Sequence, residues 1–274
     1  MLWSRQSRAN LALAIGLLAG LPLTVSAGCS RLIQVPVAAT GLSVIIDNDG
    51  IKGIYPELLR NMAEREGCSF AFSAVPRARL EVLFEAGRAD LLIPASKTPK
   101  RDAFGTFIPL IHNRAQLISL QSVRPAIKSA GELLEQTSLK VALVRGFDYG
   151  AAYQELVAAL EKQGRAVFEV DSLSVARLLK AGSADATIMA PSILAGALQT
   201  DERVRELMER LRFESLAELP WGDSGAYVSN QSLSAQDQST LQAALERAAQ
   251  SGVVWKGFQK RYAPAVLQGS IRPL

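Results

Sequence analysis

Hydrophobic positions beyond residue 31 fall into short continuous runs that alternate with stretches of helical spacing. The runs at 32–37, 69–75 and 90–95 predict buried strands. Between them, apolar residues three and four positions apart predict one helix that starts near Pro56 and another that carries Leu80. This β-α-β-α-β order predicts a parallel sheet.

A second series of the same kind follows. Residues 109–120 have an extended pattern, and strands are predicted over 139–144 and 166–170. Asp171 is placed to cap the helix that follows, and Pro191 to begin another. The chain is therefore expected to build a second α/β unit.

One ten-residue pattern occurs twice. Residues 86–95 and residues 181–190 both read A-G-x-A-D-x-x-I-x-A. Each copy predicts a helix that ends at glycine, a short turn and a buried strand. Two lobes of similar build account for the repeat, although chance recurrence of a common helix-to-strand connection does so too. Ligands bind where strands end in open α/β sheets, so the residues after Ala95 and Ala190 are the first places to look for a site.

The last part of the chain is predicted to return to the first lobe. Residues 221–229 have the pattern of a strand, and a helix is expected to begin at Ser234. The expected division is a signal peptide at 1–27, the first part of lobe 1 at 28–118, lobe 2 at 119–222, and a return to lobe 1 with the C-terminal helices at 223–274.

The first 27 residues have the features of a secretory signal peptide. Arg5 and Arg8 form a basic start, an interrupted apolar run covers 11–25, and small residues follow for cleavage. The alternative is lipid anchoring at Cys29, but Ser26 stands where a lipobox usually has an aliphatic residue. We therefore expect simple cleavage and a soluble periplasmic protein.

Charge and composition exclude several classes of function. The net charge of +4 falls to about +2 once Arg5 and Arg8 are removed, and the basic residues are scattered, so nucleic acid is not an expected partner. The single histidine, His112, excludes multi-histidine metal sites and is expected to be a packed or surface residue rather than a base. Phosphate-cradling glycine loops, H-E-x-x-H and G-x-S-x-G are all missing from the sequence, so we expect no metal, no cofactor and no enzyme.

The two cysteines each precede a predicted strand. Cys29 lies before 32–37 and Cys68 before 69–75, so neighbouring parallel strands would bring them to the same sheet edge. In an exported protein this favours a disulfide over two unpaired buried thiols. Closing such a loop is worth about 4 kcal/mol in the chain-entropy model.

A hydroxyl and a guanidinium follow the first copy of the repeat. Ser96 ends the strand and Arg101 comes five residues later, after a predicted turn. These two groups suit a carboxylate, which arginine holds with two hydrogen bonds. The alternative is a solvated basic turn in which Arg101 forms a cap or a salt bridge.

Several short motifs, taken in order, resemble a known family. They are Gly-Ile-Tyr-Pro-Glu-Leu at 53–58, Ala-Gly-Arg-Ala-Asp at 86–90, and Thr-Pro-Lys-Arg at 98–101 with Phe107 and Pro109 beyond. In this order the chain resembles the family 3 periplasmic solute-binding proteins, the amino-acid-type receptors of ABC importers. The resemblance implies a type II periplasmic binding fold, with two α/β lobes, two hinge crossings and a ligand cleft. It also implies a monomer that works with the membrane subunits of an importer or with a membrane sensor.

The resemblance also implies a set of ligand-binding residues. Ser96 and Arg101 match the family's holders of an α-carboxylate, Arg77 matches a pocket-lining position, and Asp148 falls in a second-lobe loop that usually offers Thr or Ser. The acidic residue expected for an ammonium group is replaced by Ala190, which argues against an ordinary α-amino acid. Two arginines facing the cleft favour an anion such as an acidic amino acid or an organic acid, with Asp148 as an alternative ammonium contact. The expected ligand-binding set is Thr40, Arg77, Ser96, Arg101, Phe147 and Asp148.

Other interpretations stay open at this level. Arg77 and Arg79 would then lie on a solvated helix start, and Asp148 would cap the next helix. Periplasmic cyclohexadienyl dehydratases resemble the same family, and for such an enzyme Glu57 or Asp148 would be the general acid. A third hypothesis is a sensor or interaction module without a ligand.

Overall fold

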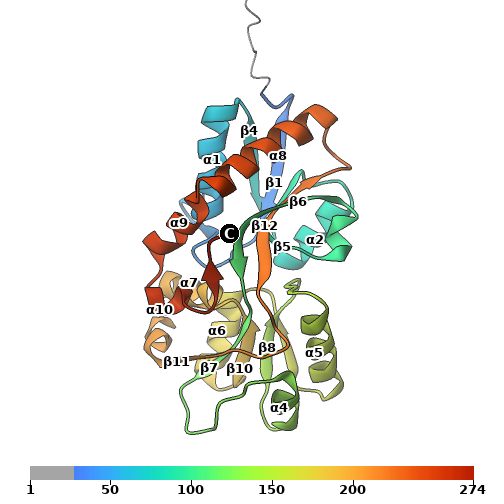
Figure 1. Cartoon of the computed structure of the whole chain (residues 1–274). Helices are drawn as coiled ribbons and strands as arrows, with labels where there is room; N and C mark the ends of the chain where they lie inside the picture. Colours follow the sequence, from blue (N-terminus) through green and yellow to red (C-terminus); the bar gives the residue numbers. More distant parts are fainter. Residues whose placement is uncertain (1–27) are drawn as a thin grey trace, which may run out of the picture.

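The structure, a computed structural model, describes residues 28–274, so the predicted signal peptide at 1–27 lies outside the described residues. Two α/β lobes lie one above the other, as Figure 1 shows. The first lobe contains the sheets β1-β4 and β13-β6-β12-β5, and the second contains the sheet β11-β7-β10-β8-β9. The expected two-lobe α/β architecture is confirmed.

The first lobe begins with the predicted β-α-β unit. β1 (Leu32–Val37) and β4 (Ser69–Ala74) pair in parallel, and α1 (Ile54–Glu66) connects them after the hairpin of β2 (Ile45–Asp47) and β3 (Gly50–Lys52). α1 starts two residues before the expected Pro56. A second helix, α2 (Arg77–Glu85), leads to β5 (Leu91–Ser96).

The predicted parallel pairing is present for β1 and β4, but the prediction was wrong for β5. β5 pairs antiparallel with β12 (Gly222–Ser229), which also pairs with β6 (Gly105–Asn113), while β13 (Ile271–Arg272) covers the far edge of β6. β12 follows the second lobe in the chain and pairs with β5 along most of its length. β1 meets β5 at its start, where Asp90 N–H donates to Gln34 O over 2.9 Å.

The second lobe is a mixed five-stranded sheet. β8, β9 and β10 are parallel, and the crossing strand β7 and the returning β11 pair antiparallel. The strands are β7 (Gln116–Leu120), β8 (Val141–Val144), β9 (Ala166–Glu169), β10 (Ala186–Met189) and β11 (Leu211–Glu214). The helices are α4 (Ala130–Glu135), α5 (Ala151–Lys162), α6 (Ser172–Ala181), α7 (Pro191–Thr200) and the 3₁₀ helix η1 (Arg205–Arg210).

Helix ends follow the predicted capping residues. Asp171 accepts a hydrogen bond from Ser174 N–H over 2.7 Å at the start of α6, and Pro191 is the first residue of α7. Ser234 caps α8 (Ala235–Gln250), which lies diagonally across the first lobe in Figure 1. α9 (Val253–Arg261) and α10 (Pro264–Leu267) complete the chain before β13.

The core of the first lobe lies between its strands and the helices α1, α8 and α9. Leu59, Leu241 and Phe258 come from the three helices and are buried together. Across residues 28–274 the structure contains no helix with the length and apolar character needed to span a membrane.

The repeated sequence builds the same connection in both lobes. Gly87 and Gly182 both take left-handed backbone angles, with φ of 63° and 66°. Asp90 then accepts a hydrogen bond from Gln34 N–H, and Asp185 accepts one from Lys140 N–H, each over 2.7 Å. Each aspartate therefore ties the start of the strand that follows it to another strand of its lobe, β1 in the first lobe and the residue before β8 in the second.

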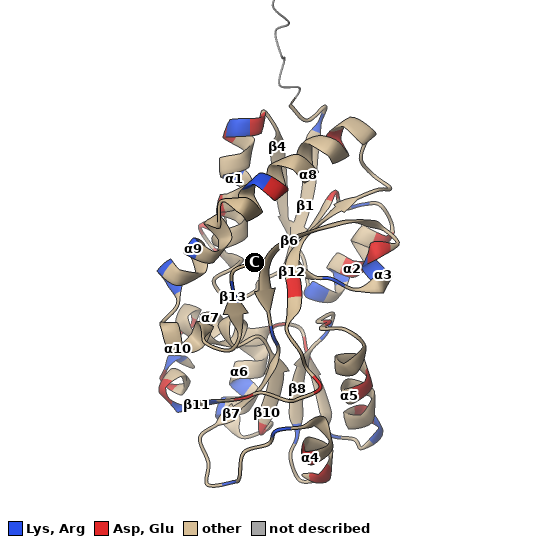
Figure 2. Ribbon diagram, in the orientation of Figure 1, with Lys and Arg blue, Asp and Glu red and all other residues tan. Residues whose placement is uncertain are grey.

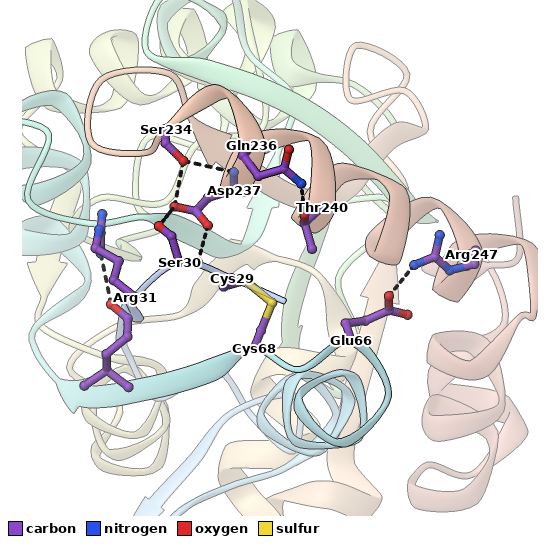
Figure 3. The surroundings of a disulfide bond; sticks show 11 residues. Cys29, Ser30, Arg31, Glu66, Cys68, Ser234, Gln236, Asp237, Thr240 and Arg247 are labelled. Carbon is purple, nitrogen blue, oxygen red and sulfur yellow. Dashed lines mark hydrogen bonds and ion pairs between the residues drawn. A yellow bond between two sulfur atoms is a disulfide. The ribbon is translucent and has the colours of Figure 1, made fainter. Parts of the chain in front are cut away.

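The predicted disulfide is present. Cys29 and Cys68 are joined with their Cα atoms 4.6 Å apart, at the shared edge of β1 and β4. Figure 3 shows the neighbouring Ser30, whose backbone N–H and hydroxyl both donate to the Asp237 carboxylate of α8. This first segment of the described chain is thus bound to two elements of the first lobe.

The hydrogen bonds to the Asp90 carboxylate predict that the stability of the fold falls at acidic pH. Both Arg31 Nη atoms, Ser232 Oγ and Gln34 N–H donate to its carboxylate. Burial opposes ionisation, but these hydrogen bonds outweigh it, and the pKa of Asp90 lies below its ordinary value. The stabilisation is present above the unfolded pKa of about 3.9 and is lost as the pH falls through the lower folded pKa.

We therefore expect Asp90→Asn to lower the free energy of unfolding at pH 7 by about 2 kcal/mol and to flatten its dependence on pH below about 4. Urea unfolding at a series of pH values measures both effects. The matched control is Asp185→Asn, which removes the equivalent tie from an exposed position and should have a smaller effect. Equal slopes for the wild type and Asp90→Asn would contradict the prediction.

Candidate functional site

A small cavity lies between the two lobes. Its volume is about 40 Å³, which is space for a few waters or one very small solute. The first lobe and the crossing strands contribute Thr40, Arg77, Pro94, Ala95, Ser96, Asn113 and Ser224. The second lobe contributes Phe147, Asp148, Tyr149 and Ile193. The strand end at Ala95, which the repeat indicated, therefore lies at the cavity.

Arg77 is the cationic side chain of this cavity. It is the first residue of α2 and is buried, and it donates from Nη1 to Pro94 O over 3.0 Å and from Nε to Gly146 O over 3.4 Å. Its guanidinium lies 5.9 Å from the centre of the Phe147 ring. Arg77 thus belongs to the first lobe and contacts the second, and the alternative of a solvated helix start does not hold.

Burial and charge both act on Arg77. Burial, followed by the positive charge of Arg101, lowers the pKa of Arg77 to about 10. The guanidinium is therefore still charged at neutral pH. It is a buried cation in a small cavity, which suits an anionic group of a solute.

Asp148 and Tyr149 contribute the polar groups of the second lobe. Asp148 Oδ1 accepts a hydrogen bond from Gly150 N–H over 2.8 Å, just before α5, so the side chain has a local structural role and also lines the cavity. Tyr149 Oη accepts from Ala190 N–H over 3.1 Å. Burial raises the pKa of Tyr149 to about 12, so its hydroxyl keeps its proton at neutral pH and can donate.

The remaining polar lining consists of neutral side chains. Ser96 and Ser224 face each other across the β5–β12 pair, and Thr40 donates from its hydroxyl to Ala38 O over 2.9 Å. Asn113 ends β6, at the first crossing between the lobes. A second cavity of about 40 Å³ shares Ser96, Asn113 and Tyr149 with the first. Hydroxyl and amide groups therefore surround the two charged side chains.

Arg101 is placed differently from the expectation. It is 3% exposed and does not line this cavity, because its guanidinium donates to both carboxylate oxygens of Glu81, over 3.1 and 2.6 Å. Its Nη1 donates to Ser96 O over 2.7 Å. The alternative that Arg101 forms a salt bridge is therefore present in the structure. The Arg101 side chain is buried, however, and not solvated as that alternative supposed.

An outer cavity of about 470 Å³ lies beside the inner one. It is lined by Glu81, Lys100 and Arg101 of the first lobe and by Tyr153 and Phe168 of the second. Phe147 and Asp148 line both cavities. Figure 2 shows acidic and basic segments interspersed over both lobes, with residues of both signs on α2 and α3 (Pro99–Asp102).

Other candidate residues lie away from the cavity. Glu57 is half exposed and accepts from Arg261 over 2.6 Å, so it is not placed as a general acid for the inner cavity. His112 is partly exposed and its Nδ1 lies 2.8 Å from Asp223 Oδ1, across the β6–β12 pair. Among residues 28–274, His, Cys, Asp and Glu form no group of three or more that could hold a metal ion.

Sequence reasoning missed Glu81, Asn113, Tyr149 and Ser224. Tyr149 directly follows two predicted residues, so extending that loop by one position would have found it. Glu81 lies four residues after Arg77 on a helix, which is the spacing of a salt bridge. Asn113 and Ser224 gave no such signal, because only the pairing of distant strands brings them to the site.

The lobes touch through glycine backbones. A Cβ at Gly146, where φ is +82°, would lie 2.9 Å from Ala78 Cα and 3.1 Å from Arg77 C. On the other side of the cavity, a Cβ at Gly196 would lie 2.6 Å from Gly41 Cα. Side chains at these positions would force the lobes apart, since the neighbouring atoms are backbone.

Gly146→Ala is therefore expected to open the cavity. Small-angle scattering should show a larger radius of gyration for this variant than for the wild type. Gly150→Ala is the matched control, because Gly150 also has a positive φ, +95°, but a Cβ there meets nothing within 4 Å. Both variants place alanine at a positive φ, which costs about 1–3 kcal/mol, and only Gly146→Ala should change the shape. An unchanged radius for Gly146→Ala would contradict this interlobe contact.

The comparisons with known proteins find similar structures but no matching sequence. No protein-family profile and no curated protein sequence matches the chain significantly. A solved amino acid ABC transporter substrate-binding protein from Streptococcus pneumoniae bound to L-arginine is 15% identical, with a TM-score of 0.65, over 83% of this chain and 92% of that one. A putative L-cystine ABC transporter from Listeria monocytogenes is 19% identical, with a TM-score of 0.64, over 84% of this chain and 95% of that one.

A histidine kinase sensor domain described as similar to periplasmic binding proteins is 20% identical, with a TM-score of 0.66, over 89% of this chain and 98% of that one. The likeness thus extends over most of this chain and nearly all of each solved one. Together with the two lobes, the crossing strands and the cavity between them, it shows that the chain has the two-lobe α/β fold of the periplasmic binding proteins.

Proposed function

We propose that the chain is a periplasmic solute-binding protein of the amino-acid type and that it holds a small zwitterion between its lobes. One observation carries the proposal: a buried cation of the first lobe, Arg77, and an anion of the second, Asp148, line the same small cavity. A solute with a carboxylate and an ammonium group would pair with both. An organic acid, one of the two ligand classes that the sequence suggested, would use Arg77 and leave Asp148 unpaired. An acidic amino acid, the other class, would pair with both charges but bring a second carboxylate.

The placement of the two charges supports closure around the solute. Because each charge belongs to a different lobe, a ligand that contacts both stabilises the closed form over the open one. The Tyr149 hydroxyl and the neighbouring Ser96 and Ser224 offer further hydrogen bonds. The volume of about 40 Å³ favours small side chains, such as those of glycine, alanine or serine.

The proposed partner is a membrane protein that binds the closed, ligand-bound form. Solved proteins with this fold include substrate-binding proteins of ABC transporters and a sensor domain. An importer is the first proposal and a membrane sensor the alternative. Both place the mature chain in the periplasm and require no catalytic group.

Thermal unfolding and calorimetry with glycine, L-alanine, L-serine, acetate and methylamine test this function. We expect the zwitterions to raise the unfolding midpoint, and acetate and methylamine to do so weakly. Arg77→Met and Asp148→Asn should each weaken zwitterion binding about tenfold or more, since each removes one charge-assisted contact.

The control is Arg79→Met, which removes an exposed arginine from the same helix. Its affinity should equal that of the wild type. The proposed function is wrong if no solute in the panel raises the midpoint, or if Arg77→Met and Arg79→Met bind equally well.

A further inference from the structure

The buried pair of Arg101 and Glu81 has the geometry of an arginine that holds a carboxylate ligand. Nε and Nη2 of Arg101 donate to the two oxygens of Glu81 over 3.1 and 2.6 Å, side by side. Nη1 donates to Ser96 O. Each nitrogen of the guanidinium therefore has an acceptor within the protein.

The backbone around Arg101 is held in place. Thr98 caps the short helix α3, with its side chain accepting from Arg101 N–H. The buried Tyr227 accepts from Thr98 N–H over 3.0 Å and donates to Asp102 over 2.8 Å. Arg101 is thus fixed in a position from which it meets a carboxylate, and Glu81 supplies that carboxylate from α2.

Glu81 also faces the second arginine of the site. Its Oε1 lies 3.8 Å from Arg77 Nη2, which is an ion pair but too long for a hydrogen bond. The two arginines therefore share one carboxylate, and Arg77 keeps hydrogen-bonding capacity toward the inner cavity. Without Glu81, the two arginines would have only one carboxylate of the site near them, that of Asp148.

We propose that Glu81 is a built-in carboxylate that occupies the anion position at Arg101, so that the cleft accepts solutes with one acidic group and rejects diacids. The selectivity rests on the proposed function, since it concerns the solute that Arg77 binds. Glu81 and Arg101 line the outer cavity, which adjoins the inner one at Phe147 and Asp148. A second carboxylate that reached past Arg77 would meet the negative charge of Glu81 instead of a free Arg101.

Chemical rescue of Glu81→Ala tests the anion position without a physiological ligand. We expect this variant to unfold at a lower temperature than the wild type, because a buried arginine loses its partner. Sodium formate should raise its midpoint by several degrees more than sodium chloride at the same ionic strength. Glu85→Ala is the matched control, because Glu85 lies four residues further along α2 and pairs with the exposed Lys100 over 2.5 Å. Formate and chloride should act alike on the control and on the wild type.

Calorimetry with malonate and succinate tests the selectivity. Glu81→Ala should bind one of these diacids at least tenfold more tightly than the wild type does, while its affinity for the best zwitterion of the panel changes less than threefold. Glu81→Gln keeps the size of the side chain and one acceptor oxygen, and it serves for the diacid titration if Glu81→Ala does not fold.

The outcomes separate the two proposals. If neither variant gains affinity for a diacid and formate rescues no better than chloride, Glu81 is a structural salt-bridge partner and the inference is wrong. A different outcome is that formate rescues Glu81→Ala, and a diacid binds that variant, while no zwitterion binds the wild type. In that case the inference about Glu81 is supported and the proposed function is wrong.

Discussion

The contact between the start of α2 and the loop after β8 determines the geometry of the whole site. Gly146 lies so close to Ala78 that no side chain fits between them, and Arg77 therefore reaches the Gly146 carbonyl and the Phe147 ring of the other lobe. This contact fixes the separation of the lobes at the cavity. It also helps to keep the cavity small, because backbone atoms of the two lobes are in contact beside it.

Charge balance is the second constraint on the cleft. Two arginines and two carboxylates come together there, and the two arginines differ in what they contact. Arg101 is fully engaged by Glu81 and Ser96, whereas Arg77 lines the inner cavity. A buried cation without a partner is costly, and the carboxylate of Glu81 approaches Arg77 only to 3.8 Å. With Asp148 on the opposite wall, the remaining charges match one carboxylate and one ammonium group.

Much of the fold could be predicted because its signals are local. The strands β1 and β8, the caps Asp171 and Ser234 and the repeated Gly-to-Asp connection depend on neighbouring residues, and the structure contains them. The place of β5 could not be predicted, because its partner β12 lies more than a hundred residues away. Likewise, Ser96 and Arg101 were expected to act together, but a residue of another helix, Glu81, takes the guanidinium.

The sequence by itself determined two α/β lobes and the strand end at Ala95 where a site should lie, since hydrophobic spacing and capping residues act over a few positions. Only the tertiary structure decided which charged side chains pair with each other and which line the cavity. Hydrogen bonds satisfy a guanidinium within about 3 Å, and only packing determines which carboxylate comes that close. That choice engages Arg101 with Glu81 and Ser96, and it leaves Arg77 at the inner cavity.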